Sequence, residues 1–253
     1  MRILVLNPNT TESVTALMIE ASQSVAAAGT ELVPMTAKRG LPYISTRAEA
    51  QIGGAIVLEM IAEAHRSVDA VVIAAYGDPG LLGARELFDI PVIGISEAAM
   101  LTACMLGQRF ALVALSTAFN GWYRDCVEMH GLTGRCAGIY GLDQSFTSIA
   151  DVQDENLEAL VALAKGAIEA QDADSIIFAG APLAGLARKV RERIPAPIID
   201  PIAAAVKQAE ALIALAPRKA PLGSFKRPAA KTSVGLPASL SAYIAQLEDR
   251  RGA

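Results

Sequence analysis

Residues 2–10 read RILVLNPNT, and residues 109–117 read RFALVALST. In each segment an apolar run ends at small polar residues, which is the pattern of a buried strand followed by a turn. Two more pairs of segments repeat at nearly the same spacing: Ala84-Arg85 with Ala187-Arg188, and residues 91–99 (PVIGISEAA) with residues 197–205 (PIIDPIAAA). Repetition over this length indicates that the chain contains two related halves.

Within each half, short apolar runs alternate with segments of helical period. The continuous apolar run at Ala70–Ala75 (AVVIAA) is typical of a strand buried on both faces of a parallel sheet. We therefore predict an α/β fold of two pseudo-symmetric, doubly wound parallel-sheet lobes with a ligand cleft between them. The first lobe is expected to comprise residues 1–97 plus about 206–253, and the second lobe residues 98–205. Expected strands are Arg2–Leu6, Glu31–Met35, Ala70–Ala75, Pro91–Ile95, Arg109–Leu115, Cys136–Tyr140, Ser175–Ala179 and Pro197–Ile199, and expected helices include Thr11–Ala28, Arg47–Ser67, Phe119–His130, Asn156–Ala170, Ala184–Arg193 and Pro201–Leu215.

The composition excludes several classes of partner. Of the 253 residues, 53% are hydrophobic and 19% are charged, and the net charge is −4. No basic excess supports binding to nucleic acid, and no uncharged apolar run reaches the ~18 residues that a membrane span needs. The three cysteines have no metal-ligand spacing and are expected to be reduced thiols, which favours a cytoplasmic protein. We also expect the protein to form a homo-oligomer.

The residues that follow the predicted strands form the expected ligand site. In parallel α/β lobes, ligands bind beyond the carboxyl ends of the strands, so two facing lobes would share one cleft. The side chains there are small or neutral and polar, which suits a small carboxylate or a cyclic amide as substrate. No glycine-rich phosphate-binding pattern follows any strand, and we expect neither a nucleotide nor a metal ion in the cleft. The predicted substrate-binding residues are Asn9, Thr10, Ala75, Tyr76, Ser116, Thr117, Gly180 and Ala181.

Several of these strand-end motifs resemble the aspartate/glutamate/hydantoin racemase superfamily, and the hydantoin racemase branch most closely. The similarity covers about residues 1–215. It implies cofactor-independent racemisation or isomerisation of a small amino-acid-like or cyclic amide compound. The matching segments are residues 7–11 (NPNTT), residues 77–81 (GDPGL), residues 91–99, Ser116-Thr117 and residues 183–186 (LAGL).

The resemblance also implies two catalytic cysteines, one on each face of the substrate's Cα. In that mechanism one thiolate removes the proton from Cα, and the opposite thiol returns a proton. The implied positions hold Ala75 and Gly180 in this chain, or Ala181 in place of Gly180 if the register of the second motif slips by one. Neither Ala nor Gly carries a proton. The two-thiol mechanism is therefore expected not to operate, and the catalytic residues are unknown from the sequence.

Few other titratable residues follow the predicted strands. Asp78 is a weak candidate for a catalytic base, and the competing interpretation is that it caps the helix that Pro79 begins. Tyr76 is expected to pack against its neighbours. The remaining candidates are expected to be structural, the cysteines as small buried residues and the histidines at the surface or at helix ends (Cys104, Cys126, Cys136, His65 and His130).

Three functions stay open at this point. The preferred one is cofactor-independent proton chemistry next to a carbonyl group. The first alternative is a hydrolase or lyase that acts on a small cyclic amide or carboxylate, with Asp78 or a water molecule as base. The second alternative is a protein that binds a small metabolite without turnover, through closure of the two lobes.

The C-terminal part of the chain differs in composition from the two halves. Residues 216–236 are rich in Pro, Lys, Arg and Gly, which indicates an extended linker. Residues 238–250 then carry apolar residues at helical spacing. This last segment is expected to be either a short helix that docks on the protein or on a neighbour, or a frayed tail.

Overall fold

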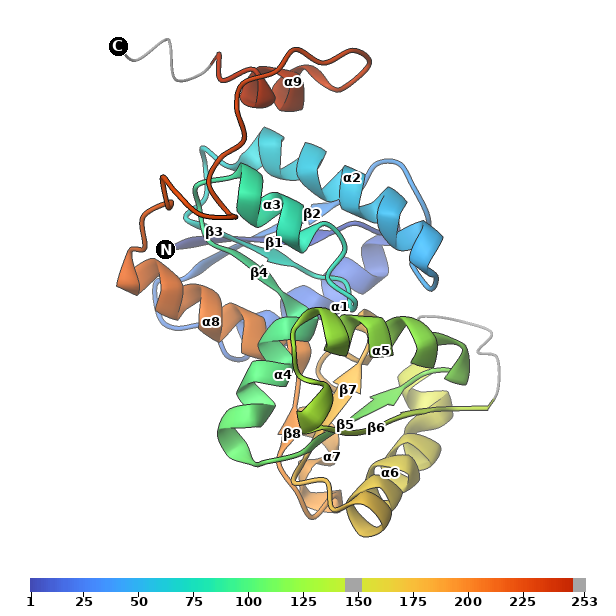
Figure 1. Ribbon diagram of the computed structural model, residues 1–253. Coiled ribbons are helices and arrows are strands. Elements are labelled where there is room, and N and C mark those ends of the chain that lie inside the picture. Colours follow the sequence, from blue (N-terminus) through green and yellow to red (C-terminus); the bar gives the residue numbers. More distant parts are fainter. Residues whose placement is uncertain (144–151, 248–253) are drawn as a thin grey trace.

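The computed structural model describes residues 1–143 and 152–247 of the chain (Figure 1). These residues form two parallel sheets of four strands, one in each half of the chain. The strand order is β2-β1-β3-β4 in the first sheet and β6-β5-β7-β8 in the second, so both halves share one topology. The predicted α/β fold of two pseudo-symmetric lobes is confirmed.

The strands begin and end within two residues of the predicted positions. Among the described residues, no helix combines the length and the apolar composition that a bilayer crossing requires. The strands are β1 (Arg2–Asn7), β2 (Glu31–Thr36), β3 (Ala70–Ile73), β4 (Val92–Gly94), β5 (Phe110–Ala114), β6 (Cys136–Gly141), β7 (Ser175–Ala179) and β8 (Ile198–Ile199). The α-helices are α1 (Glu12–Gln23), α2 (Arg47–Ala64), α3 (Leu81–Leu87), α4 (Ile95–Leu106), α5 (Asn120–Met129), α6 (Val152–Gln171), α7 (Leu186–Val190), α8 (Pro201–Leu215) and α9 (Ala238–Ile244).

The first sheet is covered on both faces because alternate residues of a strand point to opposite sides. In β1, Leu4 and Leu6 pack with α2 and α3, whereas Ile3 and Val5 pack on the side of α1 and α8. Helix α8 follows the last strand of the second lobe but lies against β3 and β4 of the first sheet. The exact domain boundaries near residues 97 and 205 stay a prediction.

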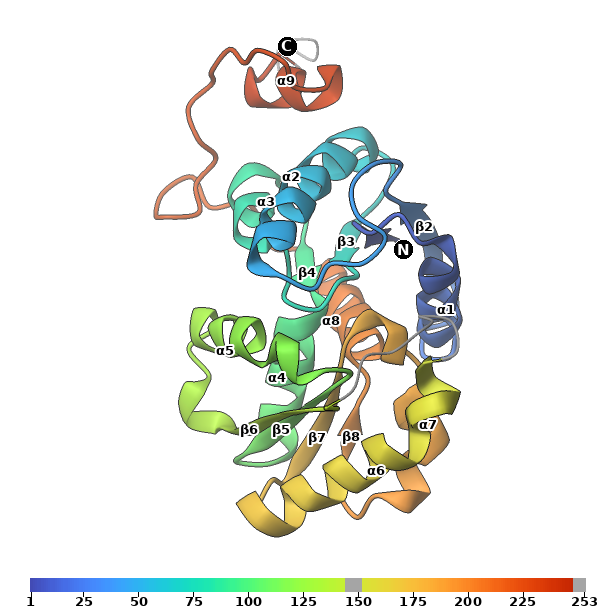
Figure 2. The same ribbon diagram turned by 90° about the vertical axis from the view of Figure 1, so that its right-hand side faces the viewer.

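The second sheet is also a central layer. Figure 2 shows α4 and α5 between this sheet and the first lobe, and α6 on the opposite side of the sheet. Helix α6 contacts β5 and β6, and α4 contacts β7. The first lobe therefore rests on the second mainly through α4, α5 and the turns that follow the strands.

Two helices are shorter than predicted by five residues or more. α1 ends at Gln23 rather than at Ala28, because the Ser24 hydroxyl donates to a backbone carbonyl three residues earlier (2.7 Å) and competes with the helical hydrogen bonds. The predicted helix Ala184–Arg193 begins later and ends in a 3-10 turn. Gly185, at φ +80°, precedes it in a left-handed conformation that a helix cannot contain.

The C-terminal segment runs back along the first lobe. The ammonium group of Lys219 donates to backbone carbonyls at the C-terminal end of α3, including those of Glu86 (2.9 Å) and Phe88 (3.1 Å). In α9, Leu240 and Tyr243 are buried in the apolar cluster formed by α2 and α3. Of the two alternatives for this segment, the structure shows the helix docked on its own chain. Residues 248–250 of the expected helix lie outside the described residues.

Candidate active site

A small cavity lies where the ends of β1 and β3 in the first lobe face the end of β7 in the second lobe. Its volume is about 10 Å³, which is room for about one water molecule. This is the position predicted for the ligand cleft, and because a substrate ring is larger than this space, the cavity walls must move apart to admit one. The cavity is lined by Asn9, Tyr43, Ile44, Ala75, Tyr76, Tyr123, Gly180 and Ala181.

The structure brings together some of the predicted substrate-binding residues and not others. Those in the cavity wall are Asn9, Ala75, Tyr76, Gly180 and Ala181, and those outside it are Thr10, Ser116 and Thr117. Ser116 instead caps the short 3-10 helix Thr117–Phe119 by accepting a hydrogen bond from the backbone N–H of Ala118 (3.2 Å). A role of these residues in substrate binding stays a prediction.

A chain of hydrogen bonds fixes the orientation of Asn9. The Asn7 side chain donates from Nδ2 to Thr11 O (3.3 Å) and Thr15 Oγ1 (2.9 Å), so its Oδ1 must face the other way. That oxygen accepts from the backbone N–H of Asn9 (3.0 Å) and from Asn9 Nδ2 (2.8 Å). Asn9 Oδ1 is left buried without a hydrogen-bond partner among the described residues. The cavity wall therefore contains an unsatisfied acceptor, which calls for a donor on the ligand, and the Tyr76 hydroxyl in the same wall is also buried without a partner among the described residues.

Ala75 and Gly180 lie in the cavity wall and come from opposite lobes. Gly180 has a φ of +137°, which residues with a side chain rarely adopt. A Cβ built on Gly180 would lie 3.9 Å from the Tyr123 hydroxyl oxygen. On the Gly180 side of the cavity, the Tyr123 hydroxyl is therefore close to the Cβ position of residue 180. On the Ala75 side, residue 75 itself contributes only a methyl group.

Tyrosines are the titratable residues that line the cavity in the described part of the chain. Burial raises the pKa of each of the three tyrosine hydroxyls above the ordinary value for tyrosine (Tyr43, Tyr76 and Tyr123). The hydroxyls of Tyr43 and Tyr123 hydrogen-bond to each other. At neutral pH these groups are therefore protonated, so they can donate a proton or a hydrogen bond, and none of them is a resting base.

Neither interpretation of Asp78 is supported by its position. Helix α3 begins at Leu81 after Gly80, so Asp78 does not cap it. Asp78 has a φ of +49°, and its carboxylate accepts from the backbone N–H groups of Ser96 and Glu97 (2.8 Å each). It therefore caps the first turn of α4 and does not line the cavity. Gly94 makes room for this contact, because a Cβ there would lie 2.2 Å from the carboxyl carbon of Asp78.

His130 is buried rather than at the surface, although it does lie at a helix end, as the residue that caps α5. Its side chain is 5% exposed, with Nε2 3.4 Å from Asp78 Oδ2 and Nδ1 3.4 Å from Glu97 Oε1. Burial opposes the charged ring, but the close contacts with Asp78, Cys126 and Glu97 outweigh it and raise the pKa of His130 to about 11. Burial also opposes the charge on Glu97, and the contacts with His130 and Arg85 lower its pKa to about 2.

This buried cluster is the part of the interface that sequence reasoning missed. Cys126 is buried, as expected, and Cys104 and Cys136 are half-buried. Cys126 in α5 and His130 at its C-terminal cap lie four residues apart, and this spacing was a usable signal that their side chains lie on one side of the helix. Nothing in the sequence placed Asp78 beside that face.

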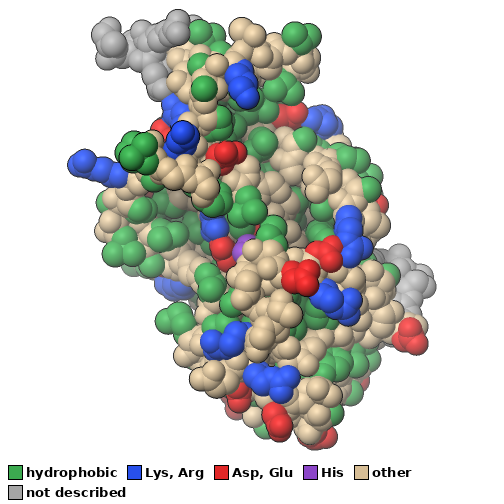
Figure 3. All heavy atoms as spheres, in the orientation of Figure 1, with side chains coloured by type: hydrophobic (Ala, Val, Ile, Leu, Met, Phe, Trp, Pro, Cys, Tyr) green, Lys and Arg blue, Asp and Glu red, His purple; other side chains and the backbone are tan. Residues whose placement is uncertain are grey.

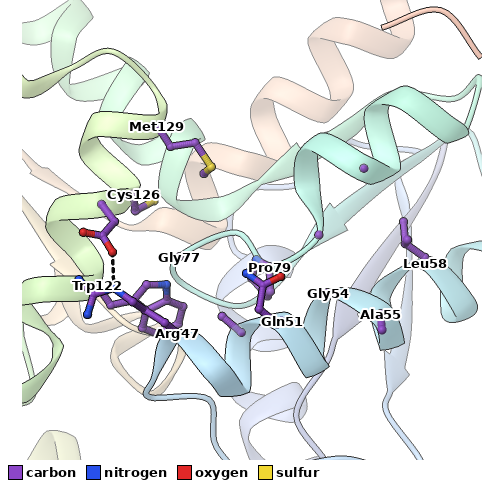
Figure 4. Close-up of a pocket in the computed structure, with 14 residues that line it drawn as sticks. Arg47, Gln51, Gly54, Ala55, Leu58, Gly77, Pro79, Trp122, Cys126 and Met129 are labelled. Carbon is purple, nitrogen blue, oxygen red and sulfur yellow. Dashed lines mark hydrogen bonds and ion pairs between the residues drawn. The ribbon is translucent and has the colours of Figure 1, made fainter.

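A second and larger cavity, of about 440 Å³, lies between α2, the turn after β3, and α5. Figure 3 shows the hollow between the lobes, with charged side chains of both signs at its rim. In Figure 4, Cys126 and Met129 project from α5 toward the turn that holds Gly77 and Pro79. At the mouth, Arg47 of α2 and Asp125 of α5 form an exposed ion pair across the two lobes.

The similarity to known proteins extends over nearly the whole chain. A family model described as Asp/Glu/Hydantoin racemase matches residues 3–209. The chain is 32% identical to the hydantoin racemase of Paenarthrobacter aurescens over 233 residues, which is 91% of this chain and 99% of that protein. Its fold is similar to those of solved allantoin racemases from Klebsiella pneumoniae (TM-score 0.89, 33% identity, 95% of this chain and 99% of that one) and Pseudomonas fluorescens (TM-score 0.86, 32% identity, 93% and 100%).

Proposed function

Because the chain belongs to the Asp/Glu/hydantoin racemase family, we propose that it catalyses cofactor-independent proton transfer at the carbon next to a carbonyl of a hydantoin-type ring. Its relatives support this substrate class, since hydantoin racemases and allantoin racemases match more than nine-tenths of the chain. Allantoin is itself a hydantoin with a substituent at C5. The proposed site is the cavity between the lobes.

The free Oδ1 of Asn9 is the observation that carries the choice of substrate. A buried acceptor without a partner is costly, typically by ~1–3 kcal/mol, so a ligand that donates to it gains affinity. A hydantoin ring has two N–H donors beside its carbonyl groups. A simple carboxylate would place its own acceptor oxygens against Oδ1. The cavity therefore favours a ligand with an N–H donor, such as a cyclic amide, over a simple carboxylate.

The proton carriers in this proposal are Tyr123 and a water molecule. The water molecule occupies the space beside Ala75, takes the proton from C5 and passes it to solvent. The electron pair of the broken C–H bond enters the enolate. The Tyr123 hydroxyl then protonates C5 from the Gly180 side, and solvent returns a proton to the phenolate through Tyr43, its hydrogen-bonded neighbour. Water is a weaker base than a thiolate, so we expect this route to be slow.

The geometry gives less support to a hydrolase or lyase. That alternative relied on Asp78 as base, and Asp78 lies outside the cavity with both carboxylate oxygens hydrogen-bonded to α4. Binding without turnover predicts no exchange of the C5 proton, so the exchange experiment below decides between it and the proposal.

We further propose that the protein assembles as a homo-oligomer. Leu101, Met105 and Leu106 on the second half of α4 are exposed, and Met105 is 85% exposed. Contiguous apolar side chains at a surface support a protein contact there. The cytoplasmic location stays a prediction.

Replacing Tyr123 with Phe should lower the rate of deuterium exchange at C5 of 5-methylhydantoin by ~10²-fold or more, because a positioned acid is lost. Phe keeps the ring packed against Tyr76, whose centroid lies 4.7 Å away, so KM should change little. The rate is measured by proton NMR in heavy water, beside a blank without protein.

Tyr43→Phe is the matched control for this variant. It removes the hydrogen-bond partner but leaves the Tyr123 hydroxyl in the cavity, so the expected loss is smaller. Exchange at the wild-type rate in Tyr123→Phe would rule out this residue as the carrier. A ring-opened product would instead favour the hydrolase, and a ligand that stabilises the protein but is recovered without deuterium would favour binding alone.

A further inference from the structure

Three side chains of the kinds that bind metal ions converge between the lobes, outside the proposed catalytic cavity. Asp78 comes from the turn after β3, Cys126 comes from α5, and His130 is the residue that caps the C-terminal end of α5. One ligand atom from each residue lies within 4.8 Å of the other two. We propose that Asp78, Cys126 and His130 bind a divalent transition metal ion, and that Zn²⁺ fits them best because it accepts mixed oxygen, sulfur and nitrogen ligands.

The distances already approach those of a tetrahedral site. With Zn–N and Zn–O bonds of about 2.0–2.1 Å, the nitrogen and oxygen ligands of a tetrahedron lie about 3.4 Å apart. His130 Nε2 and Asp78 Oδ2 are separated by 3.4 Å. A sulfur at about 2.3 Å from the metal would lie about 3.6 Å from both atoms. Cys126 Sγ, at no more than 4.8 Å, reaches this position by a shift of about 1 Å, which a change in side-chain rotation can supply.

The atoms behind the ligands are arranged as metal sites require. A histidine that binds zinc through one ring nitrogen usually donates from the other to a carboxylate. His130 Nδ1 faces Glu97 Oε1 at 3.4 Å, and Arg85 holds that carboxylate, with Nη1 2.8 Å from the same oxygen. Asp78 is held in turn by two backbone N–H groups of α4.

An unsatisfied atom gives independent support. His130 Nε2 is buried and lies 3.4 Å from Asp78 Oδ2, its ion-pair partner, but no well-aligned hydrogen bond joins the two atoms in the described part of the chain. A buried polar atom in a native structure is normally paired with protein, water or an ion. Nε2 is the nitrogen that the proposed geometry assigns to the metal.

The site would join the lobes, because the first lobe supplies Asp78 and the second supplies the other two ligands. Three protein ligands leave a fourth position on a tetrahedral ion for water or another small ligand. Gly77, Pro79 and Cys126, which border the site, also line the larger cavity between α2 and α5. This provides a path for metal entry that does not pass through the catalytic cavity. The inference is independent of the proposed function.

The test uses the full, untagged chain after treatment with a chelator that is then removed. We expect Zn²⁺ to bind with one ion per chain in isothermal titration calorimetry. Co²⁺ should give the visible bands of tetrahedral cobalt and a thiolate-to-cobalt charge-transfer band. Cys126→Ser should abolish the charge-transfer band and weaken Zn²⁺ binding by at least ~10-fold, while Cys104→Ser, the same change outside the cluster, should leave both unchanged.

Glu97→Gln provides a variant that leaves the three ligands in place. Loss of the carboxylate behind His130 should weaken Zn²⁺ binding by ~10–100-fold and keep the charge-transfer band at saturating Co²⁺. Circular dichroism with chelator present identifies any variant that fails to fold. If Cys126→Ser does not fold, the Zn²⁺ affinity of Glu97→Gln decides the proposal in its place. Absence of saturable binding in the wild type, or unchanged binding in Cys126→Ser or Glu97→Gln, would overturn the proposal.

Discussion

Replacing Ala75 with Cys should increase the rate of C5 proton exchange in 5-methylhydantoin by ~10²–10⁴-fold over the wild type, which is the usual value of a positioned general acid or base. The reason is that the thiol takes the place of a water molecule on one face of the substrate, while the Tyr123 hydroxyl stays on the other face. Thiols have a reference pKa of ~8.5, so a small fraction is thiolate at neutral pH even before the cavity tunes it. The exchange is followed by proton NMR in heavy water.

Ala75→Ser is the matched control, because serine has nearly the size of cysteine but a hydroxyl that does not ionise at neutral pH. We expect it to exchange no faster than the wild type. Equal acceleration by Ser and Cys would show that the gain does not come from a thiolate. A Cys variant at the wild-type rate would show that this position does not face C5.

Adding Gly180→Cys to the Ala75→Cys variant should give no further increase in the rate of C5 proton exchange. The φ of +137° at Gly180 is strained for any residue with a Cβ, at a cost of the order of ~1–3 kcal/mol. The new Cβ would lie in van der Waals contact with Pro182 Cδ (3.8 Å) and the Tyr123 hydroxyl (3.9 Å), and the sulfur beyond it would compete with that hydroxyl for the same face of the substrate. The double variant should therefore unfold at a lower denaturant concentration than Ala75→Cys, and it should exchange the C5 proton no faster.

Asp78→Ala should have the largest effect on stability, lowering the free energy of unfolding by ~3–5 kcal/mol, as removal of one partner of a buried pair commonly does. The substitution removes the acceptor of two backbone N–H groups of α4 and leaves His130 beside Glu97 alone. The side chains of Asp78 and His130 are 0% and 5% exposed, so the lost contacts are ones that solvent does not screen in the wild type. Urea unfolding in the presence of a chelator measures the change without any contribution from metal binding.

Asp125→Ala is the control for this prediction. Asp125 also pairs across the lobes, with Arg47, but their side chains are 50% and 62% exposed. Exposed ion pairs contribute little because water and salt screen them. We therefore expect little change in the urea midpoint. A loss in Asp78→Ala as small as that in Asp125→Ala would show that the buried cluster does not hold the lobes together.

The fold was predictable because the decisive signals are local. A continuous apolar run such as Ala70–Ala75 identifies a buried parallel strand without knowledge of the rest of the chain, and the repeat of residues 2–10 at residues 109–117 then extends the same interpretation to the second half. The shortened helix α1 was harder to predict. Ser24 ends it through a side-chain hydrogen bond to the backbone, and the free-energy difference between ending and continuing the helix at such a residue is small.

The candidate site was predictable only where it follows strand ends. Ala75 and Gly180 line the cavity because parallel strands deliver their following residues to one edge of the sheet. Tyr123 and Tyr43 gave no signal, because an aromatic residue on a helix or loop is usually core. Asp78 was misread since Asp-Pro is a common helix start, whereas its left-handed backbone turns the carboxylate toward α4 instead.

The most direct test of the proposed function is the fate of a single enantiomer of 5-methylhydantoin, incubated with the wild-type protein in heavy water with chelator present. Chiral chromatography and mass spectrometry then report the configuration and the deuterium content at C5. In the proposed mechanism the two carriers act on opposite faces of the ring, so the account predicts that the opposite enantiomer appears faster than in the blank and carries one deuterium at C5. A rate equal to the blank, or deuterium that accumulates in the starting enantiomer without inversion, would contradict it.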